Sequence, residues 1–94
     1  MNPSAPKLSL GRAMAALRER LRQGRTPYTE LKAAVRNAGL ALGHRMTDEE
    51  VRDLTQDARD NLVRLAEVCI VTTNVSNGQH TVHALTEHVE VRHV

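Results

Sequence analysis

The sequence predicts an α+β fold in which three helices precede a β-hairpin. Three observations support this prediction. Apolar residues before residue 67 recur every three or four positions, which is the period of an amphipathic helix. Residues 47–50, Thr-Asp-Glu-Glu, have the pattern of a capping box that starts a helix. Asn77-Gly78 separates two runs rich in β-branched residues, which is the pattern of a tight hairpin turn.

The first two expected helices span residues 8–23 and 27–38. Their apolar stripes consist of Leu10, Met14, Leu17 and Leu21, and of Leu31, Ala34, Val35 and Ala38. Gly24 ends the first helix. Thr26 supplies an N-cap hydroxyl for the second helix, Pro27 fits its first position, and Gly39 ends it. Residues 1–7 are expected to be a disordered lead, and residues 8–94 a single domain.

The third expected helix covers residues 47–67. In its capping box, the Thr47 hydroxyl accepts from the Glu50 amide, while the Glu50 side chain accepts from the Thr47 amide. Three acidic residues in the first turn also suit the helix dipole. The expected buried stripe, which continues into the following strand, consists of Val51, Leu54, Ala58, Leu62, Leu65 and Cys69.

The expected strands are Val68–Val75 and His80–Thr86, joined by a type I′ turn at Asn77-Gly78. Pairing outward from this turn sets Val71 opposite Ala84. One face then carries Cys69, Val71, Thr73, Val75, His80, Val82 and Ala84, and the other carries Ile70, Thr72, Asn74, Thr81, His83 and Leu85. We expect the first, more apolar face to pack on the helices. Alternating valines in residues 87–94 are compatible with a third, C-terminal strand.

Composition restricts the classes of function. The chain has one Tyr and no Phe or Trp, so it lacks the aromatic platforms that grip single-stranded nucleic acid. We find no Gly-rich phosphate loop, carboxylate pair or nucleophile–base pair, and we expect neither an enzyme nor a bound cofactor. A single cysteine, Cys69, indicates a buried, reduced thiol. No apolar run predicts a signal peptide or a membrane span, so we expect a cytoplasmic protein.

Four of the five histidines gather near the C-terminus, at His80, His83, His88 and His93. Residues three apart on a strand point to opposite faces, so His80 and His83 cannot share a metal ion. No cysteine or acidic residue lies at a familiar ligand spacing. We therefore expect surface or interface histidines and no metal site. A pH-sensitive interface is the open alternative.

Charge is divided between the two halves of the chain. Residues 1–46 hold nine Lys and Arg against two acidic residues, which is +7, and residues 47–94 hold four against nine, which is −5. The two values sum to the net charge of +2. Such a division indicates either electrostatic binding to a partner or pairing of the halves on folding.

Three helices followed by a polar-tipped hairpin is the order of a winged helix-turn-helix domain. Residues 61–86 resemble the segment of MarR- and ArsR-type regulators that runs from the end of the recognition helix through the wing. The matching positions are Leu62, Leu65, Ile70-Val71, Asn77-Gly78 and Leu85-Thr86. The resemblance implies a small DNA-binding transcriptional regulator that acts as a homodimer on double-stranded DNA.

Two sets of charged or polar residues carry the functional hypotheses. For DNA binding, the candidates are Arg18, Arg22, Arg25, Lys32, Arg36, Arg45, Asn74, Asn77, Gly78 and His80. The basic helix positions would form one patch if the first two helices packed antiparallel, and would contact mainly phosphates.

The alternative hypothesis is a protein-binding adaptor or inhibitor, of the kind that phages and mobile elements encode. Its candidate residues, on one face of the third helix, are Glu49, Asp53, Asp57 and Asp60. Carboxylates on that helix repel phosphates and disfavour insertion into the major groove. A structural subunit of a homo-oligomer is a third hypothesis.

Overall fold

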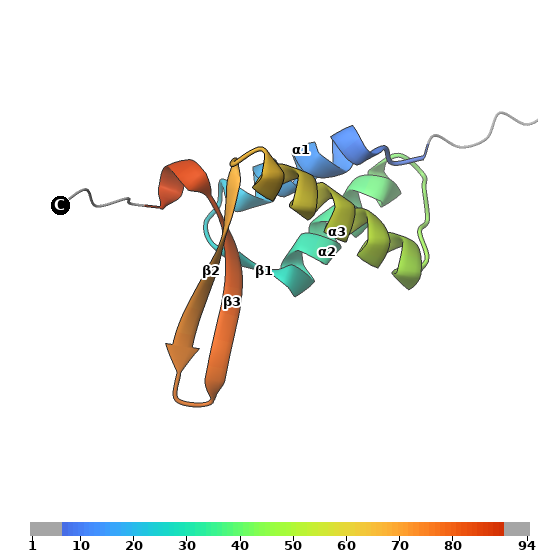
Figure 1. Cartoon of the computed structure of the whole chain (residues 1–94). Coiled ribbons are helices and arrows are strands. Elements are labelled where there is room, and N and C mark those ends of the chain that lie inside the picture. Colours follow the sequence, from blue (N-terminus) through green and yellow to red (C-terminus); the bar gives the residue numbers. More distant parts are fainter. Residues whose placement is uncertain (1–6, 90–94) are drawn as a thin grey trace, which may run out of the picture.

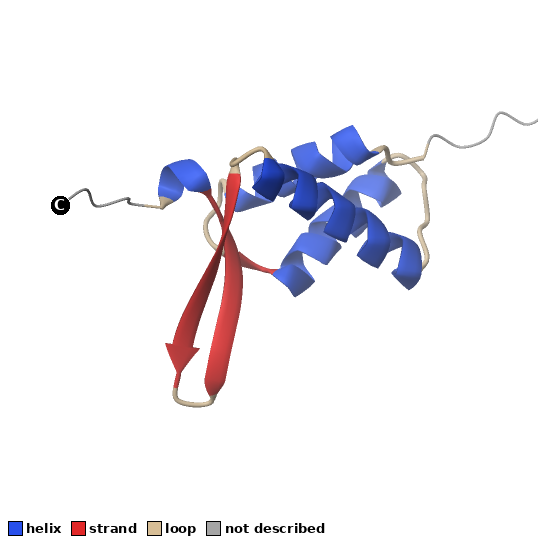
Figure 2. Cartoon of the chain, viewed as in Figure 1, coloured by secondary structure: helices blue, strands red, loops and turns tan. Residues whose placement is uncertain are grey.

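The computed structural model describes residues 7–89, except the side chain of Val75. Its elements are α1 (Leu10–Leu21), β1 (Thr26–Pro27), α2 (Tyr28–Ala41), α3 (Asp48–Arg64), β2 (Val68–Val75), β3 (Gly78–Leu85) and a 3₁₀ turn, η1 (Thr86–His88). The helices pack together, and the β2–β3 hairpin projects from one end of them (Figure 1 and Figure 2). The predicted α+β fold with a winged-helix-like layout is confirmed. Apart from Lys7, the expected N-terminal lead lies outside the described residues.

The core lies between the three helices and the base of the hairpin. Its buried members are Leu8, Ala13, Leu17, Leu21, Leu31, Val35, Met46, Val51, Ala58, Leu62, Val68 and Leu85. Two leucines of the predicted stripes lie outside it, because Leu10 is 39% exposed and Leu65 is 57% exposed. Leu10 is the first residue of α1, and Leu65 is the C-cap of α3. Neighbouring helices do not cover these ends, so the periodic pattern overestimates the core there.

The link between α1 and α2 is a strand and not the predicted helix cap. Thr26 and Pro27 form β1, which pairs with His83 and Val82 of β3. The buried Thr26 hydroxyl donates to the Gly24 carbonyl (2.9 Å) and does not cap α2. Proline favours an extended conformation in the residue that precedes it. The third strand of the sheet therefore comes from the segment before α2.

Gly39 lies inside α2, whereas the sequence predicted that it would end the helix. α2 continues to Ala41, with Leu42 as its C-cap. The connector that follows turns back across the helix, and the His44 amide donates to the Gly39 carbonyl (2.8 Å). A Cβ atom on Gly39 would lie 2.6 Å from Met46 Cε and 3.0 Å from the His44 carbonyl oxygen. A side chain at this position would press against Met46 and the His44 carbonyl, so Gly39 favours the close approach of the connector.

α3 begins with the predicted capping box. The Thr47 amide donates to Glu50 Oε1 (3.0 Å), and the Glu50 amide donates to Thr47 Oγ1 (3.1 Å). The hydrogen bond from the Thr47 amide lowers the pKa of the Glu50 carboxyl group. The box defines the N-terminus of α3 directly after the connector.

The hairpin keeps the predicted faces but has a different register. Val71 pairs with Val82, and not with Ala84 as predicted. The register moves by two residues, so each side chain stays on its predicted face.

The turn begins one residue earlier than predicted. Ser76 and Asn77 form it, and Gly78 is already the first residue of β3. Gly78 has a φ of +127°, and Ala66 is the only described residue other than glycine with a positive φ. A type I′ turn requires positive φ at both central residues. The turn is therefore of another type, and Gly78 supplies the positive φ directly after it.

Buried residues at the base of the hairpin lie on both faces, and most of them lie on the face opposite the predicted one. Ala84 is buried on the predicted face, where Val71 and Val82 are only half-buried, whereas Val68, His83 and Leu85 are buried on the opposite face. The reason is the pairing of β3 with β1, which sets the His83 side chain against the N-terminal end of α2.

The predicted C-terminal strand is not found within the described residues. Residues 86–88 form η1, and residues 90–94 lie outside the described part of the chain. The base of the hairpin is joined to the end of α3 by Thr86. Its amide donates to the Glu67 carbonyl (2.9 Å), and its hydroxyl donates to the Ala66 carbonyl (2.7 Å).

His83 joins the hairpin to the helices. Its side chain is 1% exposed, although the sequence predicted a surface or interface histidine. Nδ1 lies 3.3 Å from the Thr26 carbonyl oxygen, which accepts a hydrogen bond from the Nδ1–H tautomer. Nε2 is buried without a hydrogen-bond partner among the described residues. Burial lowers the pKa of His83, so the folded protein holds this imidazole in its neutral form.

We predict that His83 makes folding stability depend on pH. The unfolded chain takes up a proton on this histidine near pH 6.5, whereas the folded chain resists protonation. Stability is therefore fully present above that pH and is lost as pH falls towards the lower folded pKa, with a slope of at most about 1.4 kcal/mol per pH unit. Urea unfolding measured between about pH 8 and pH 5 checks this expectation.

The variant that tests the cause is His83→Asn, which cannot titrate and should flatten this slope. His80→Asn is its matched control, because His80 is exposed on the same strand. An unchanged slope in His83→Asn would show that other groups produce the pH dependence.

Candidate nucleic-acid interface

The crossing of α2 and α3 brings aromatic and basic side chains together beside the base of the hairpin. Tyr28, the first residue of α2, lies at its centre. Lys32 Nζ lies 5.5 Å from the centroid of the Tyr28 ring, and Arg59 Cζ of α3 lies 5.4 Å from it. The Tyr28 hydroxyl donates to the Arg52 carbonyl (3.2 Å). These contacts place cations from both helices around one ring.

The two flanks of α3 differ in charge. Its buried residues are Val51, Thr55, Ala58 and Leu62. At 100° per residue, Arg52 and Arg59 lie on one flank of this stripe, and Glu50 and Asp57 lie on the other. The first flank faces α2 through the contacts with Tyr28. The second lines a depression that it shares with Lys7, Leu8 and His44.

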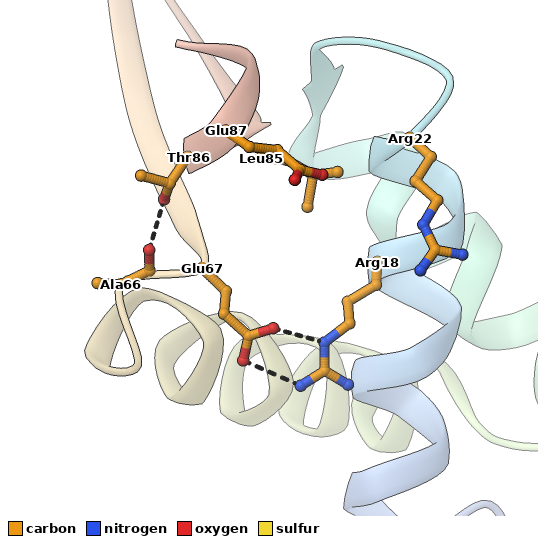
Figure 3. Close-up of a pocket in the computed structure, with 7 residues that line it drawn as sticks. All are labelled: Arg18, Arg22, Ala66, Glu67, Leu85, Thr86 and Glu87. Carbon is orange, nitrogen blue, oxygen red and sulfur yellow. Dashed lines mark hydrogen bonds and ion pairs between the residues drawn. The ribbon is translucent and has the colours of Figure 1, made fainter. Parts of the chain in front are cut away.

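The basic residues predicted from the sequence do not form one patch. Arg18 and Arg22 line a depression beside the base of the hairpin, drawn in Figure 3. Lys32 and Arg36 line a different depression, between α2 and the start of α3. The remaining two, Arg25 and Arg45, are exposed in the connectors after α1 and after α2.

Arg18 holds a structural ion pair. Its Nε donates to Glu67 Oε1 (2.9 Å) and its Nη2 to Glu67 Oε2 (3.1 Å), and the two side chains point at each other in Figure 3. This bidentate pair joins α1 to the segment between α3 and β2. The hydrogen bonds raise the pKa of Arg18 and lower the pKa of Glu67. Arg18 is therefore engaged within the fold and is less available to a ligand.

Most cations of the α2–α3 crossing have acidic neighbours. Arg36 pairs with Asp48, and Arg59 with Asp60. Arg52 lies between two acids, 3.8 Å from Glu49 and 3.4 Å from Asp53. Lys32 forms no ion pair with any residue in the described range 7–89. Lys32 is thus the cation of this group that a phosphate can approach without displacing a carboxylate.

The outer half of the hairpin is exposed and uncharged. Every side chain described in residues 72–81 is exposed, and none is ionised at neutral pH when histidine is neutral. The predicted contact residues Asn74, Asn77, Gly78 and His80 all lie in this stretch. Their amide and imidazole groups can donate and accept hydrogen bonds, but they give the hairpin no attraction to phosphate at a distance.

The four carboxylates of the alternative hypothesis, Glu49, Asp53, Asp57 and Asp60, are all exposed on α3. Asp57 forms no ion pair within residues 7–89, and its carbonyl accepts from the Asn61 side chain (2.7 Å). Asp48 pairs with Arg36 of α2, and Asp60 pairs with the adjacent Arg59.

The remaining chemically active side chains lie apart from one another. Within residues 7–89, no three His, Cys, Asp or Glu residues lie close enough to hold a metal ion. His80 and His88 are exposed, and His93 lies outside the described residues. Cys69 is half-buried and not fully buried as predicted, with its Sγ 3.4 Å from Thr86 Oγ1.

Tyr28, Arg52 and Arg59 were not among the site residues predicted from the sequence. Arg52 and Arg59 are seven residues apart, which is two helical turns, so their spacing already places them on one side of α3. Tyr28 and Lys32 are four apart in α2. That these two pairs meet depends on how the helices cross, which the sequence alone does not show.

Comparison of the chain with models of protein families, with curated proteins and with solved structures found no match. No helix in the described part of the chain is long and apolar enough to cross a membrane. The fold is an α+β domain with a winged-helix-like layout, in which three helices pack with an antiparallel sheet of order β1-β3-β2.

We predict that Arg18→Ala lowers the Tm by a few degrees, because it removes both hydrogen bonds to Glu67. Since the pKa of Glu67 is lowered, this stabilisation is present above its usual value of 4.5 and is lost as pH falls through the folded pKa. Thermal unfolding followed by circular dichroism at about pH 7 and about pH 3 measures both effects.

The matched control for this prediction is Arg22→Ala. Among the described residues, Arg22, the C-cap of α1, pairs only with Glu19 of that helix, and both side chains are exposed. Equal changes in Tm for Arg18→Ala and Arg22→Ala would contradict a structural role for the Arg18–Glu67 pair.

Proposed function

We propose that the protein is a small DNA-binding transcriptional regulator of winged-helix type. Double-stranded DNA would lie against α2, the α2-facing flank of α3 and the hairpin. The observation that carries the proposal is the exposure of the described side chains in the outer half of the hairpin, beyond the helical body (Figure 1). The described side chains of residues 72–81 are not buried in the core, so they present a polar surface to a ligand.

The charge distribution supports contacts to phosphates beside the hairpin. Lys32 and Arg59 lie against the Tyr28 ring at the start of α2, and the main-chain carbonyl of Arg52 accepts from the Tyr28 hydroxyl. No side chain caps this N-terminus, so the positive end of the helix dipole adds to the cations. Phosphates attracted here would bring the neutral hairpin against a groove, where its amide groups can bind base edges.

The acidic residues of α3 determine the strength and the mode of this binding. Arg52 and Arg59 must exchange carboxylate partners for phosphates, so each contributes less than an unpaired cation. The outward acids Glu49 and Asp60 disfavour deep insertion of α3 into the major groove. We therefore propose moderate affinity, mostly from backbone contacts, that falls steeply with salt.

We predict that Lys32→Ala weakens binding to duplex DNA and lowers the salt dependence of binding by about one unit of slope, because one phosphate contact is lost. Fluorescence anisotropy with labelled genomic fragments, measured across a salt series, gives both quantities. Gln79→Lys should strengthen binding about threefold or more at low salt, because it adds a cation to the hairpin.

Two controls remove or add the same charge elsewhere. Arg64→Ala removes a cation from the other flank of α3, and Gln23→Lys adds one after α1. The proposal is wrong if no duplex is bound at low salt, or if Lys32→Ala and Gln79→Lys behave like these controls.

The exposed acidic row of α3 favours a second candidate function, the binding of a basic protein surface as an adaptor or inhibitor. Glu49, Asp53, Asp57 and Asp60 present four carboxylates to solvent on one helix. Neutral amides at these positions keep the shape but remove the charge. This function predicts a specific co-purifying protein that is lost when all four are replaced (Glu49→Gln, Asp53→Asn, Asp57→Asn, Asp60→Asn).

Glu19→Gln with Glu30→Gln is the control for the acidic row, because these residues are exposed acids of α1 and α2. Tagged protein at near-native expression, analysed by mass spectrometry of captured proteins, is the measurement. Capture of the same protein by the fourfold variant would exclude the acidic row as its binding site.

A further inference from the structure

β2 is an edge strand with one unpaired side. The sheet order β1-β3-β2 places β3 between the other two strands. β2 pairs with β3 along its whole length, from Val68 with Leu85 to Val75 with Gly78. Within the described residues, no strand pairs with the other side of β2. Alternate residues of β2 therefore direct their N–H and C=O groups away from the sheet.

This edge lacks the features that usually prevent strands from associating. Natural edge strands carry Lys, Pro, inward-pointing charges or bulges. Val68–Val75, with the sequence VCIVTTNV, contains no charged residue, no Pro and no Gly, and its pairing with β3 runs without a bulge. Six of its eight residues are β-branched and favour the extended conformation. By contrast, the outer side of β3 is paired at its base by β1, which contains Pro27.

The surface of this strand fits another strand. Ile70 is 48% exposed, one of the large apolar side chains of the described chain that remain open to solvent. Val71 beside it is half-buried, and the next three residues, Thr72, Thr73 and Asn74, are exposed. An added strand would cover Ile70 and satisfy the outward backbone groups at the same time.

A second copy of the chain is the occupant that these features favour. When two identical strands pair antiparallel in one sheet, a two-fold axis perpendicular to the sheet relates them. Each side chain then lies on the same face of the sheet as the side chain opposite it in the second copy. With the axis at Thr72, Ile70 lies opposite Asn74 of the second copy, and Val71 opposite Thr73. Because β2 carries no charge, no like charges meet on the axis. Both copies supply the same length of unpaired edge.

We propose that two copies of this protein associate through their β2 edges, which pair antiparallel over Ile70–Asn74 and join two three-stranded sheets into one of six strands. A homodimer is expected from the sequence, and this edge offers a surface for it. The inference uses no residue of the α2–α3 crossing, although Thr72, Thr73 and Asn74 also belong to the part of the hairpin that is proposed to contact DNA. It is also tested in the absence of DNA, so that its failure is separate from failure of the proposed function.

The experiment measures the association state of the full chain by sedimentation equilibrium across a dilution series. The wild-type chain should form a dimer. Thr72→Lys places two lysines opposite each other at the axis, with their Cβ atoms about 5 Å apart. Repulsion between the two ammonium groups should raise the dimer dissociation constant about tenfold or more. Thr72 is exposed, and circular dichroism should show an unchanged fold.

Two further variants make the test specific for the edge. Thr81→Lys adds the same charge to β3 directly opposite Thr72, away from the unpaired side, and should leave the dimer intact. Thr72→Glu alone should also weaken self-association, whereas an equimolar mixture of Thr72→Lys and Thr72→Glu chains should form mixed dimers, seen by native mass spectrometry.

Three results would overturn the proposal. One is a wild-type chain that stays monomeric at every concentration. Another is a Thr72→Lys dimer as tight as wild type. The third is equal weakening by Thr72→Lys and Thr81→Lys, since charge on either strand would then act alike.

Discussion

The pairing of β1 with β3 is the contact on which the rest of the arrangement depends. Only Thr26 and Pro27 form β1, yet they hold the hairpin beside the start of α2. His83 is carried on β3 into contact with the Thr26 carbonyl and lies near the Tyr28 ring, at 6.3 Å between centroids. The hairpin therefore leaves the helical body at the point where Lys32 and Arg59 gather. Without this short strand, the basic crossing and the polar hairpin would not be neighbours.

The charged residues of α3 form two different surfaces on the two flanks of this helix. Arg52 and Arg59 face α2, while Asp57 and Glu50 face the side of His44 and Lys7. The unequal charge of the two halves of the sequence is thus partly resolved inside the fold, by pairs such as Arg18 with Glu67. What remains exposed is mixed in sign, so association with either DNA or a basic protein is sensitive to ionic strength.

The sequence predicted the types and order of the main elements well, and their contacts less well. Helix periodicity, the Thr47–Glu50 capping box and the β-branched runs are local properties, and they appear in the structure nearly where expected. The two-residue strand β1 is too short to show a period, and its partner lies more than fifty residues away. Gly39 had a non-local role in packing the connector. The candidate site was missed in part because Tyr28 and Arg59 meet only through the helix crossing.

The aromatic content of the chain makes Tyr28 useful as a spectroscopic probe. Tyr28 is the only aromatic residue among Phe, Trp and Tyr in all 94 residues. Its ultraviolet absorption and intrinsic fluorescence therefore come from one known place, between two cations at the α2–α3 crossing. Occupation of that crossing changes the environment of the only natural fluorophore, so the protein contains its own optical reporter of binding. A tryptophan introduced elsewhere would obscure that reporter.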